Sequence, residues 1–447
     1  MPKQKKFLCS ECGDVFAKWL GKCPTCGTFN SIVEFRESKI IENNDKISGG
    51  KNLVDINQEI SFEKKERLLS SISEVDRVLG QGFFPGSVTL FGGQPGIGKS
   101  TLALQIFLNI TDAFYFSGEE SEEQILSRVH RLESSKNTKN LEKKIFSTNY
   151  LEDIIATIEK EKPKFIIIDS IQMIGTKNIN FGSVAQIREN AEILIKYAKS
   201  LNIAILVIGH VTKNEELAGP KILEHLVDAV LYLEGEKNSE IRILRTLKNR
   251  FGSNLEIGVF EMQEKGLLEL KNPSKFFLAE RAENSCGSTI SVIREGGRNF
   301  LLEIQALTLK TNFGQPRRTA YGIDLAKLHL LLAVVSKFTP FKCENFDAYL
   351  NVVGGFKITD PAADASICAA ILSSRAEKEI SAETIILGEV GLSGEIRHIP
   401  YLKSRITEAQ KMGFKKILCP KLLEKINIKG INILEIRNVA DLLRNIF

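Results

Sequence analysis

Two pairs of cysteines near the start of the chain have the spacing of a metal site. Cys9 and Cys12 form one CxxC pair, and Cys23 and Cys26 form a second pair after ten intervening residues. Each pair can turn two thiolates toward one point, and four thiolates complete the tetrahedral shell of a structural Zn²⁺ site. The alternatives are two redox pairs or an iron–sulfur site. We favour zinc because so short a segment has almost no core and needs a metal to fold.

A glycine-rich segment further along has the pattern of a phosphate-binding loop. Gly93, Gly98, Lys99 and Ser100 match GxxxxGKS between an apolar run at 88–91 and a helical pattern. In this context backbone N–H groups and a helix N-terminus hold phosphates, Lys99 reaches the β- and γ-phosphates, and the Ser100 hydroxyl binds Mg²⁺. The expected ATP-binding loop comprises Gly93, Gln94, Pro95, Gly96, Ile97, Gly98, Lys99, Ser100 and Thr101.

Acidic residues stand directly after two other apolar runs. Asp169 follows Phe165–Ile168, where the Mg²⁺-side carboxylate of a nucleotide site is expected. The alternative for Asp169 is a turn former or helix cap. Glu119 and Glu120 follow Ala113–Phe116; Glu119 is our first choice for orienting the attacking water and Glu120 the second. The alternative for this pair is an acidic helix start that suits the helix dipole.

Short apolar runs alternate with helical patterns between residues 67 and 272, and these elements must position the loop and the carboxylates. Such alternation predicts βαβ units and a mainly parallel sheet. The later runs lie closer together, which indicates antiparallel strands near the sheet edge. The runs are Val88–Phe91, Ala113–Phe116, Phe165–Ile168, Ile203–Ile208, Ala229–Leu233 and Ile241–Leu244. Asn272-Pro273 marks a break, after which a second α/β block begins.

The composition narrows the class of protein. The 447 residues are 43% hydrophobic, which is enough for real cores, and the net charge of +5 is too mild to indicate nucleic-acid binding by itself. The start MPKQKKFLC has no apolar signal region, and the apolar runs are far shorter than a membrane span. We therefore expect a cytoplasmic protein without membrane contact, in which Cys286, Cys343, Cys368 and Cys419 are buried thiols.

Over nearly its whole length the chain resembles the bacterial RadA (Sms) family of DNA repair proteins. The resemblance rests on the four-cysteine finger, the loop Gly92–Thr101, the Ser117–Ser121 box, the string Lys248–Gly252 (KNRFG) and a C-terminal block similar to the proteolytic domain of Lon proteases. The KNRFG string is the most specific of these features. The family implies a C4 zinc finger at 1–30, a linker at 31–62, a RecA-like P-loop ATPase domain at 63–275 and a Lon-protease-like domain at 276–447.

The resemblance also implies an activity. The family forms hexameric rings that use ATP to move on single-stranded and branched DNA, and promotes branch migration together with a RecA-type recombinase. The expected function is therefore a DNA-dependent ATPase with ATP, Mg²⁺ and Zn²⁺ as cofactors. The alternative is a nucleotide-gated scaffold that binds DNA or a partner without directional motion. An ATP-dependent protease is disfavoured by the residue at position 362.

Two basic residues in the KNRFG string are expected to act across a subunit boundary. In a strand, Lys248 and Arg250 would share one face, and both could reach a γ-phosphate bound by a neighbouring subunit. The alternative is a solvated turn. His210 is a candidate γ-phosphate sensor or an ordinary structural histidine. The candidate DNA-phosphate contacts, each equally well an ordinary solvated charge, are Lys177, Arg188 and Lys213.

The C-terminal block lacks the nucleophile of the proteases it resembles. The serine of the Lon dyad is expected in a GPSAG-type turn, but this chain has Asp360-Pro361-Ala362-Ala363-Asp364 there. Lys403 matches the position of the base, and Ser366 would be mis-aimed by its helical offset. We therefore expect a proteolytically inactive scaffold, with Arg317-Arg318 as a candidate DNA contact.

Overall fold

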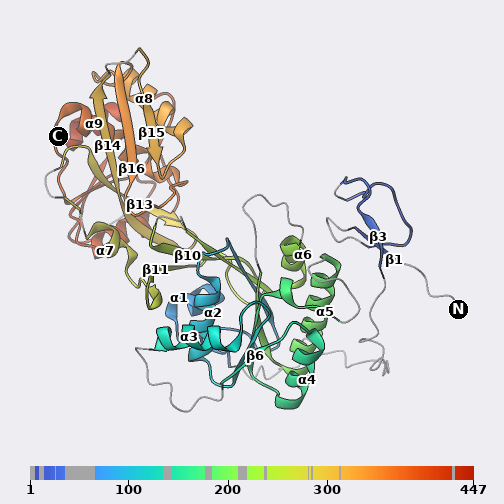
Figure 1. The fold of residues 1–447 in the computed structure, drawn as a ribbon. Coiled ribbons are helices and arrows are strands. Elements are labelled where there is room, and N and C mark those ends of the chain that lie inside the picture. The colour runs from blue at the N-terminus through green and yellow to red at the C-terminus, as the bar shows by residue number, and fades with distance from the viewer. Residues whose placement is uncertain are drawn as a thin grey trace, which may run out of the picture. The chain divides into compact units, whose positions relative to one another are not determined.

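The computed structural model describes two compact units, which divide between Glu269 and Leu270 (Figure 1). The four-part division expected from the sequence stays a prediction. In the described part of the chain, no helix is long and apolar enough to cross a membrane. The described residues are 6–9, 15–25, 27–35, 66–133, 143–176, 184–209, 219–235, 239–279, 281–282, 285–311, 314–424 and 428–447.

The N-terminal ribbon is a small antiparallel sheet of β1 (Lys6–Cys9), β2 (Val15–Phe16) and β3 (Ile32–Phe35), in the order β2-β1-β3. Its core contains the fully buried Cys9 and Cys23. So few apolar side chains bury little surface, and a segment of this size needs a metal or other staple to be stable.

The first unit also contains a nine-stranded sheet, counted over the described residues, in the order β12-β11-β10-β9-β4-β8-β7-β5-β6. The strands from β9 to β6 in this order are parallel, and β10, β11 and β12 continue the sheet antiparallel, as the closer spacing predicted. The strands are β4 (Val88–Gly93), β5 (Ala113–Ser117), β6 (Lys143–Ser147), β7 (Phe165–Asp169), β8 (Ala204–Ile208), β9 (Ala229–Glu234), β10 (Ile241–Asn249), β11 (Ile257–Gln263) and β12 (Gly266–Glu269).

Helices cover both faces of this sheet (Figure 1). One core lies beneath α1 (Ser73–Leu79), α2 (Lys99–Asn109) and α3 (Glu122–Glu133). The other lies beneath α4 (Leu151–Glu161), α5 (Val184–Leu201) and α6 (Gly219–Leu226). Because side chains alternate along a strand, β7 sends Phe165 and Ile167 into the first core and Ile166 and Ile168 into the second. This double burial explains why the central strands are continuous apolar runs.

The second unit contains a mixed sheet with the order β15-β16-β14-β13-β17-β20-β21 and a short pair, β18 with β19. Its strands are β13 (Ser288–Glu295), β14 (Arg298–Lys310), β15 (Arg318–Tyr321), β16 (Phe346–Val352), β17 (Thr384–Ile386), β18 (Glu389–Val390), β19 (Ile396–Arg397), β20 (Lys416–Cys419) and β21 (Asn432–Glu435). Its helices are α7 (Pro273–Leu278), α8 (Leu325–Phe338), α9 (Asp364–Ala376), α10 (Leu402–Lys411) and α11 (Val439–Ile446).

Candidate functional site

The glycine-rich loop joins β4 to α2, as the sequence predicted. Gly93 has a φ of 149° and Gly98 has a φ of 110°. Residues that have a side chain rarely adopt such positive φ values. A β-carbon on Gly93 would lie 2.6 Å from the Leu233 carbonyl oxygen, and one on Gly98 would lie 2.5 Å from the Met262 methyl carbon. The backbone conformation therefore favours glycine at both ends of the loop, and the Leu233 carbonyl oxygen leaves no room for a side chain at Gly93.

Lys99 lies almost completely buried at the start of α2. Its Nζ donates hydrogen bonds to the carbonyl oxygens of Gly93, at 2.8 Å, and Gln94, at 3.0 Å. Burial lowers the pKa of Lys99 to about 8, and the nearby carboxylates of Asp169 and Glu119 oppose this shift. The structure thus brings the loop lysine and both first-choice acidic residues into one electrostatic neighbourhood.

The parallel register explains why residues so far apart in sequence meet here. Phe91 on β4 is level with Ile208 on β8, and Ser117 on β5 is level with Asp169 on β7. The carboxyl ends of parallel strands lie at one edge of a sheet, which is where α/β folds place ligands. Strands β8 and β7 separate β5 from β4, so Glu119 reaches the site from the far side of Asp169.

Asp169 is held by a tyrosine that sequence reasoning missed. The buried Tyr115 hydroxyl donates a hydrogen bond of 2.6 Å to Asp169 Oδ2. Burial and the Asp169 charge raise the pKa of Tyr115, so the phenol stays a donor. Asp169 Oδ1 is buried and has no hydrogen-bond partner among the described residues. A buried carboxylate oxygen left over in this way suits a hard divalent cation such as Mg²⁺.

Glu119 and Glu120 point to different partners. Glu119 Oε1 accepts a 2.5 Å hydrogen bond from the Ser170 hydroxyl, and Glu119 is one of the charges that act on Lys99. Glu120 instead forms an ion pair with Arg128 on α3. This geometry favours Glu119 over Glu120 as the residue that faces bound phosphate, although its role in orienting water stays a prediction.

Lys248 and Arg250 lie at the opposite edge of the sheet from the loop of their own subunit. Asn249 on β10 is level with Ala229 on β9, which is level with Thr89 near the start of β4. Gly93 is four residues further along β4, so the separation along the strands is about 13 Å at roughly 3.3 Å per residue. Within one subunit, the two cations therefore lie far from Lys99.

The two cations are close to each other although the strict strand alternation behind the prediction does not hold. Strand β10 has a bulge between Thr246 and Lys248 and ends at Asn249, so Arg250 lies just beyond it. Burial lowers the pKa of Lys248, and the charge of Arg250 adds to the shift. Lys248 Nζ donates to the carbonyl oxygens of Glu224 and His225 at 2.8 and 3.0 Å.

Arg250 is half exposed and is tethered at one end. Its Nη1 lies 3.2 Å from Asp228 Oδ1, and its backbone N–H donates to the Asp228 carbonyl oxygen. The other oxygen of that carboxylate, Asp228 Oδ2, accepts from the Val88 N–H on β4. The sheet therefore holds the Arg250 backbone and one guanidinium nitrogen, while about half of the side chain stays exposed.

The other members of the KNRFG string build the turn that carries these cations. Asn249 donates through its side-chain amide to the Leu79 carbonyl oxygen and accepts from the Phe251 N–H. Phe251 stacks on Phe84 with ring centroids 4.3 Å apart. Arg67 donates to the Phe251 carbonyl oxygen at 2.7 Å. Lys248 and Arg250 are thus the cations of the string, and Asn249 and Phe251 anchor the turn that carries them.

Arg242 is a further residue that the sequence did not single out. It lies buried on β10, and its Nε donates to the Ile97 carbonyl oxygen of the loop at 3.1 Å. Burial lowers its pKa. A charged residue inside the apolar run Ile241–Leu244 was the available signal. Arg242 supports the loop from behind through the backbone of its own subunit.

Several predicted positions lie outside the described residues: Cys12, Cys26, Lys177, His210 and Lys213. Arg188 on α5 forms an exposed ion pair with Glu192 at 3.0 Å.

Cys9 and Cys23 come from separate segments and are both fully buried in the ribbon core, which fits two thiolates of a shared metal shell. Of the four other cysteines, Cys286 is exposed, so the expectation of a buried thiol is wrong there; it lines a surface cavity of about 400 Å³.

Among the described residues of the second unit, the positions expected for a peptidase dyad do not form one. Ala362 is fully buried at the 3₁₀ turn Pro361–Ala363, whereas Lys403 is exposed on α10. Ser366 is fully buried and donates to the Ile386 carbonyl oxygen. Beside Ala362, Asp360 pairs with the buried Arg405 at 2.6 Å. Asp360 also accepts a hydrogen bond from the Ala362 N–H at 3.0 Å, so the buried pair is tied to this turn.

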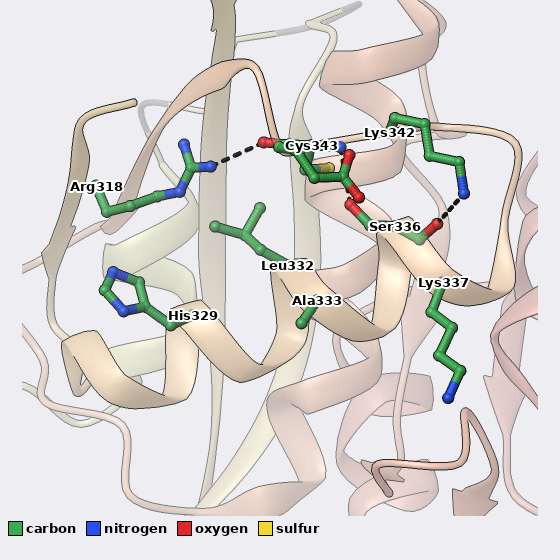
Figure 2. A pocket seen from close by; sticks show the side chains of 9 residues that line it. Arg318, His329, Leu332, Ala333, Ser336, Lys337, Lys342 and Cys343 are labelled. Carbon is green, nitrogen blue, oxygen red and sulfur yellow. Dashed lines mark hydrogen bonds between the residues drawn. The ribbon is translucent and has the colours of Figure 1, made fainter. Parts of the chain in front are cut away.

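A cavity of about 540 Å³ lies between α8 and the loop before β16 in the second unit. Arg318, Lys337 and Lys342 bring positive charge to its lining, which also contains His329 (Figure 2). Arg318 is engaged there, because its guanidinium donates to the carbonyl oxygens of Cys343, at 2.8 Å, and Phe346. The neighbouring Arg317 is exposed. Of the predicted Arg317-Arg318 pair, Arg318 thus serves the fold of its own unit.

Three parts of the chain match models of known protein families. Residues 58–216 match the family described as AAA domain, residues 7–34 match the rubredoxin metal binding domain, and residues 343–422 match subunit ChlI of Mg-chelatase. The solved structure of a DnaB-like replicative helicase is 17% identical with a TM-score of 0.41, and the match covers 46% of this chain and 62% of that chain. A RadB recombinase structure is 20% identical with a TM-score of 0.36, covering 46% and 100%.

Relatives span the whole chain. A protein of Streptococcus pyogenes serotype M6 named DNA repair protein RadA is 44% identical, with 100% of this chain and 99% of the relative covered. The proteins of that name from Listeria monocytogenes and Rickettsia bellii are also 44% identical, and cover 93% and 94% of this chain and 92% and 94% of their own length. With its zinc-ribbon, RecA-like P-loop and Lon-like regions in this order, the chain belongs to the DNA repair protein RadA family.

Proposed function

We propose that this protein is a DNA-dependent ATPase that moves on single-stranded DNA and promotes branch migration of recombination intermediates. The observation that carries the proposal is the separation of one ATPase site over two edges of the sheet: Lys99, Asp169 and Glu119 at one edge, Lys248 and Arg250 at the other. The names of the relatives support DNA repair as the context. The domain boundaries at 30, 62 and 275 and a cytoplasmic location belong to the same proposal.

The loop edge would hold ATP and Mg²⁺. Backbone N–H groups of residues 93–98 and the N-terminus of α2 would receive the phosphates, and Lys99 would exchange its bonds to loop carbonyls for bonds to phosphate oxygens. The residues that would hold Mg²⁺ are Ser100 and Asp169. When bound, the ion supplies charge neutralisation at the β- and γ-phosphates. Glu119, aimed by Ser170, would orient the attacking water.

The finger edge would complete the site of a neighbour. Because Lys248 and Arg250 cannot reach their own loop, they serve catalysis only if a second copy places its loop against them. A head-to-tail contact of this kind repeats around a closed ring, and we propose a homo-hexamer. In that setting the two cations stabilise the negative charge that builds on the transferred phosphoryl group.

The alternative function, a nucleotide-gated scaffold, makes a different prediction for the same assay. The motor predicts that single-stranded DNA stimulates ATP turnover and that a branched substrate is converted with ATP but not with a non-hydrolysable analogue. The scaffold predicts nucleotide-dependent rings without branch movement. Adding a RecA-type recombinase to the branched substrate tests the proposed partner. ATP turnover that does not depend on DNA, together with a branch point that does not move, would contradict the proposed DNA-driven translocation.

Removal of the Tyr115 hydroxyl should weaken the use of Mg²⁺. Tyr115→Phe leaves the ring in the core but deprives Asp169 Oδ2 of its donor, so the carboxylate is free to turn. Loss of such a supporting hydrogen bond typically costs roughly 10- to 100-fold in metal affinity. We expect the Mg²⁺ concentration for half-maximal nucleotide binding to rise by about tenfold, measured by equilibrium titration with a fluorescent ATP analogue.

Tyr197→Phe is the matched control, because Tyr197 donates to the surface carboxylate of Glu159 at 2.9 Å. It should leave the Mg²⁺ titration unchanged. A Tyr115→Phe protein that loses thermal stability but keeps the native Mg²⁺ midpoint would show that the hydroxyl serves the fold alone.

We also propose that Cys9, Cys12, Cys23 and Cys26 hold one structural Zn²⁺. The two described members are buried together in the ribbon core, and the match to a metal binding domain covers all four positions. Chelation should release one zinc per chain and unfold residues 7–30, because metal binding and folding are coupled in such segments. Limited proteolysis with and without chelator reads this out; a ribbon that stays resistant after zinc is removed contradicts the site.

A further inference from the structure

Two aromatic side chains of the N-terminal ribbon stand in solvent. Trp19 is 57% exposed and Phe29 is 69% exposed. In the same ribbon, Phe7 and Phe16 pack against the cysteine core. The exposure is therefore selective, because the ribbon has an apolar core and still presents two rings outside it. Large exposed aromatic groups of this kind are typical of contact surfaces.

Both rings are attached to one hairpin. The Cys23 N–H donates to the Thr28 carbonyl oxygen and the Asn30 N–H donates to the Gly21 carbonyl oxygen, each at 2.9 Å. Lys22 lies opposite Phe29 as a bridge partner, and its Nζ is 5.0 Å from the Phe29 ring centroid. The Trp19 ring lies 3.7 Å from the β-carbon position of Gly21. Phe29 is thus paired with Lys22, and Trp19 lies beside the same hairpin.

The charge around the rings is positive. Between Asp14 and Glu34 the sequence contains Lys18 and Lys22 and no acidic residue. Both lysines are exposed. An aromatic ring offers a stacking face to any base, and lysines beside it attract the phosphate backbone. This combination fits single-stranded nucleic acid better than an apolar protein surface, which would leave the two ammonium groups unmatched.

We infer that Trp19, Lys22 and Phe29 form a contact site for single-stranded nucleic acid. Bases stack on Trp19 and Phe29, and Lys18 and Lys22 pair with phosphates. The site reads no base edges, so it tolerates any sequence. The inference deepens the proposed function, because it gives that function's single-stranded partner a second contact outside the ATPase domain. It requires neither ATP nor hydrolysis.

The chain has a single tryptophan, so its intrinsic emission reports on Trp19 alone. The probe is an oligothymidylate, added without nucleotide to the full-length protein. Saturable quenching of the tryptophan emission is expected, over the same concentrations at which a labelled copy of the oligonucleotide gains anisotropy. Lys99→Ala should quench equally, because the contact is independent of ATP.

The variants test ring and charge separately. Trp19→Ala and Lys22→Glu should each weaken binding of the labelled oligonucleotide by roughly tenfold, whereas Trp19→Phe should keep most of the affinity. Leu20→Ala is the matched control, since Leu20 is an exposed apolar neighbour without a ring. Zinc content, measured for each variant, verifies that the ribbon remains folded.

Three results would overturn the inference. Quenching of Trp19 emission by added iodide reports how accessible the ring is to solvent. If the oligonucleotide gains anisotropy while the Trp19 emission and its quenching by iodide stay unchanged, the DNA contact lies elsewhere and the proposed function stands. If no oligonucleotide binds to the native protein, both the inference and the proposed DNA function fail. If a recombinase protects Trp19 from iodide and the oligonucleotide does not, the surface is a protein-docking site.

Discussion

Replacing Lys99 with alanine should lower ATP turnover by roughly 100- to 1000-fold, the range found when a preorganised donor to a developing charge is removed. Lys99 is buried at the loop with Asp169 and Glu119 nearby. Its ammonium group would contact the phosphates of bound ATP. Affinity for ATP should fall as well, because Nζ would exchange its bonds to the Gly93 and Gln94 carbonyl oxygens for bonds to the bound phosphates. Phosphate release at saturating ATP and single-stranded DNA measures the first effect, and nucleotide titration measures the second.

Lys144→Ala provides the comparison, because Lys144 is a partly exposed lysine on β6 that pairs with Glu161. That variant should turn over ATP at the native rate. Native turnover in Lys99→Ala would instead remove the loop from the reaction and with it the proposed ATPase.

Replacing Arg250 with alanine should lower turnover by about 10³-fold or more, as loss of an arginine finger does, while ATP binding stays near native. The two effects separate because Arg250 lies at the sheet edge away from its own loop. Steady-state turnover and equilibrium nucleotide binding on the same preparation measure the split. Arg245→Ala controls for general damage to β10, since Arg245 pairs with Glu234 on β9.

A mixing experiment distinguishes action across the subunit boundary from action within one chain. Lys99→Ala and Arg250→Ala proteins are each expected to be inactive alone. In an equal mixture, about a quarter of the head-to-tail interfaces combine an intact loop with an intact finger, so turnover should reappear. A mixture that remains as inactive as its components would place Arg250 outside the neighbour's site.

The nucleotide loop was predictable because the residues that form it are adjacent in the sequence. The run from Gly93 to Ser100 specifies both the turn and its ligand, and the strand before it and the helix after it were found where the sequence placed them. Asp169 and Glu119 were predictable for a related reason: each lies at or just after the end of a strand, and parallel strands end at one edge.

The supporting residues could not be found in this way. Tyr115 lies in the middle of an apolar run, and only the pairing of β5 with β7 reveals that it serves Asp169. Arg242 reaches the loop across three-dimensional space, over 145 residues of sequence separation. Lys403 shows the opposite failure, because its sequence position matches a base but its helix turns the side chain outward. Local patterns specify chemistry well and side-chain direction poorly.

The pair formed by Asp360 and Arg405 limits which substitutions the turn at position 362 would accept. Arg405 is 2% exposed and is also bound to the carbonyl oxygens of Val292 and Pro400. Removing one partner of such a buried pair costs about 3–5 kcal/mol, since the other charge is left without compensation. Asp360 also accepts a hydrogen bond from the Ala362 N–H, so a larger residue at position 362 that displaced Asp360 would carry this cost. We therefore expect the second unit to tolerate sequence change at its exposed positions more readily than at this turn.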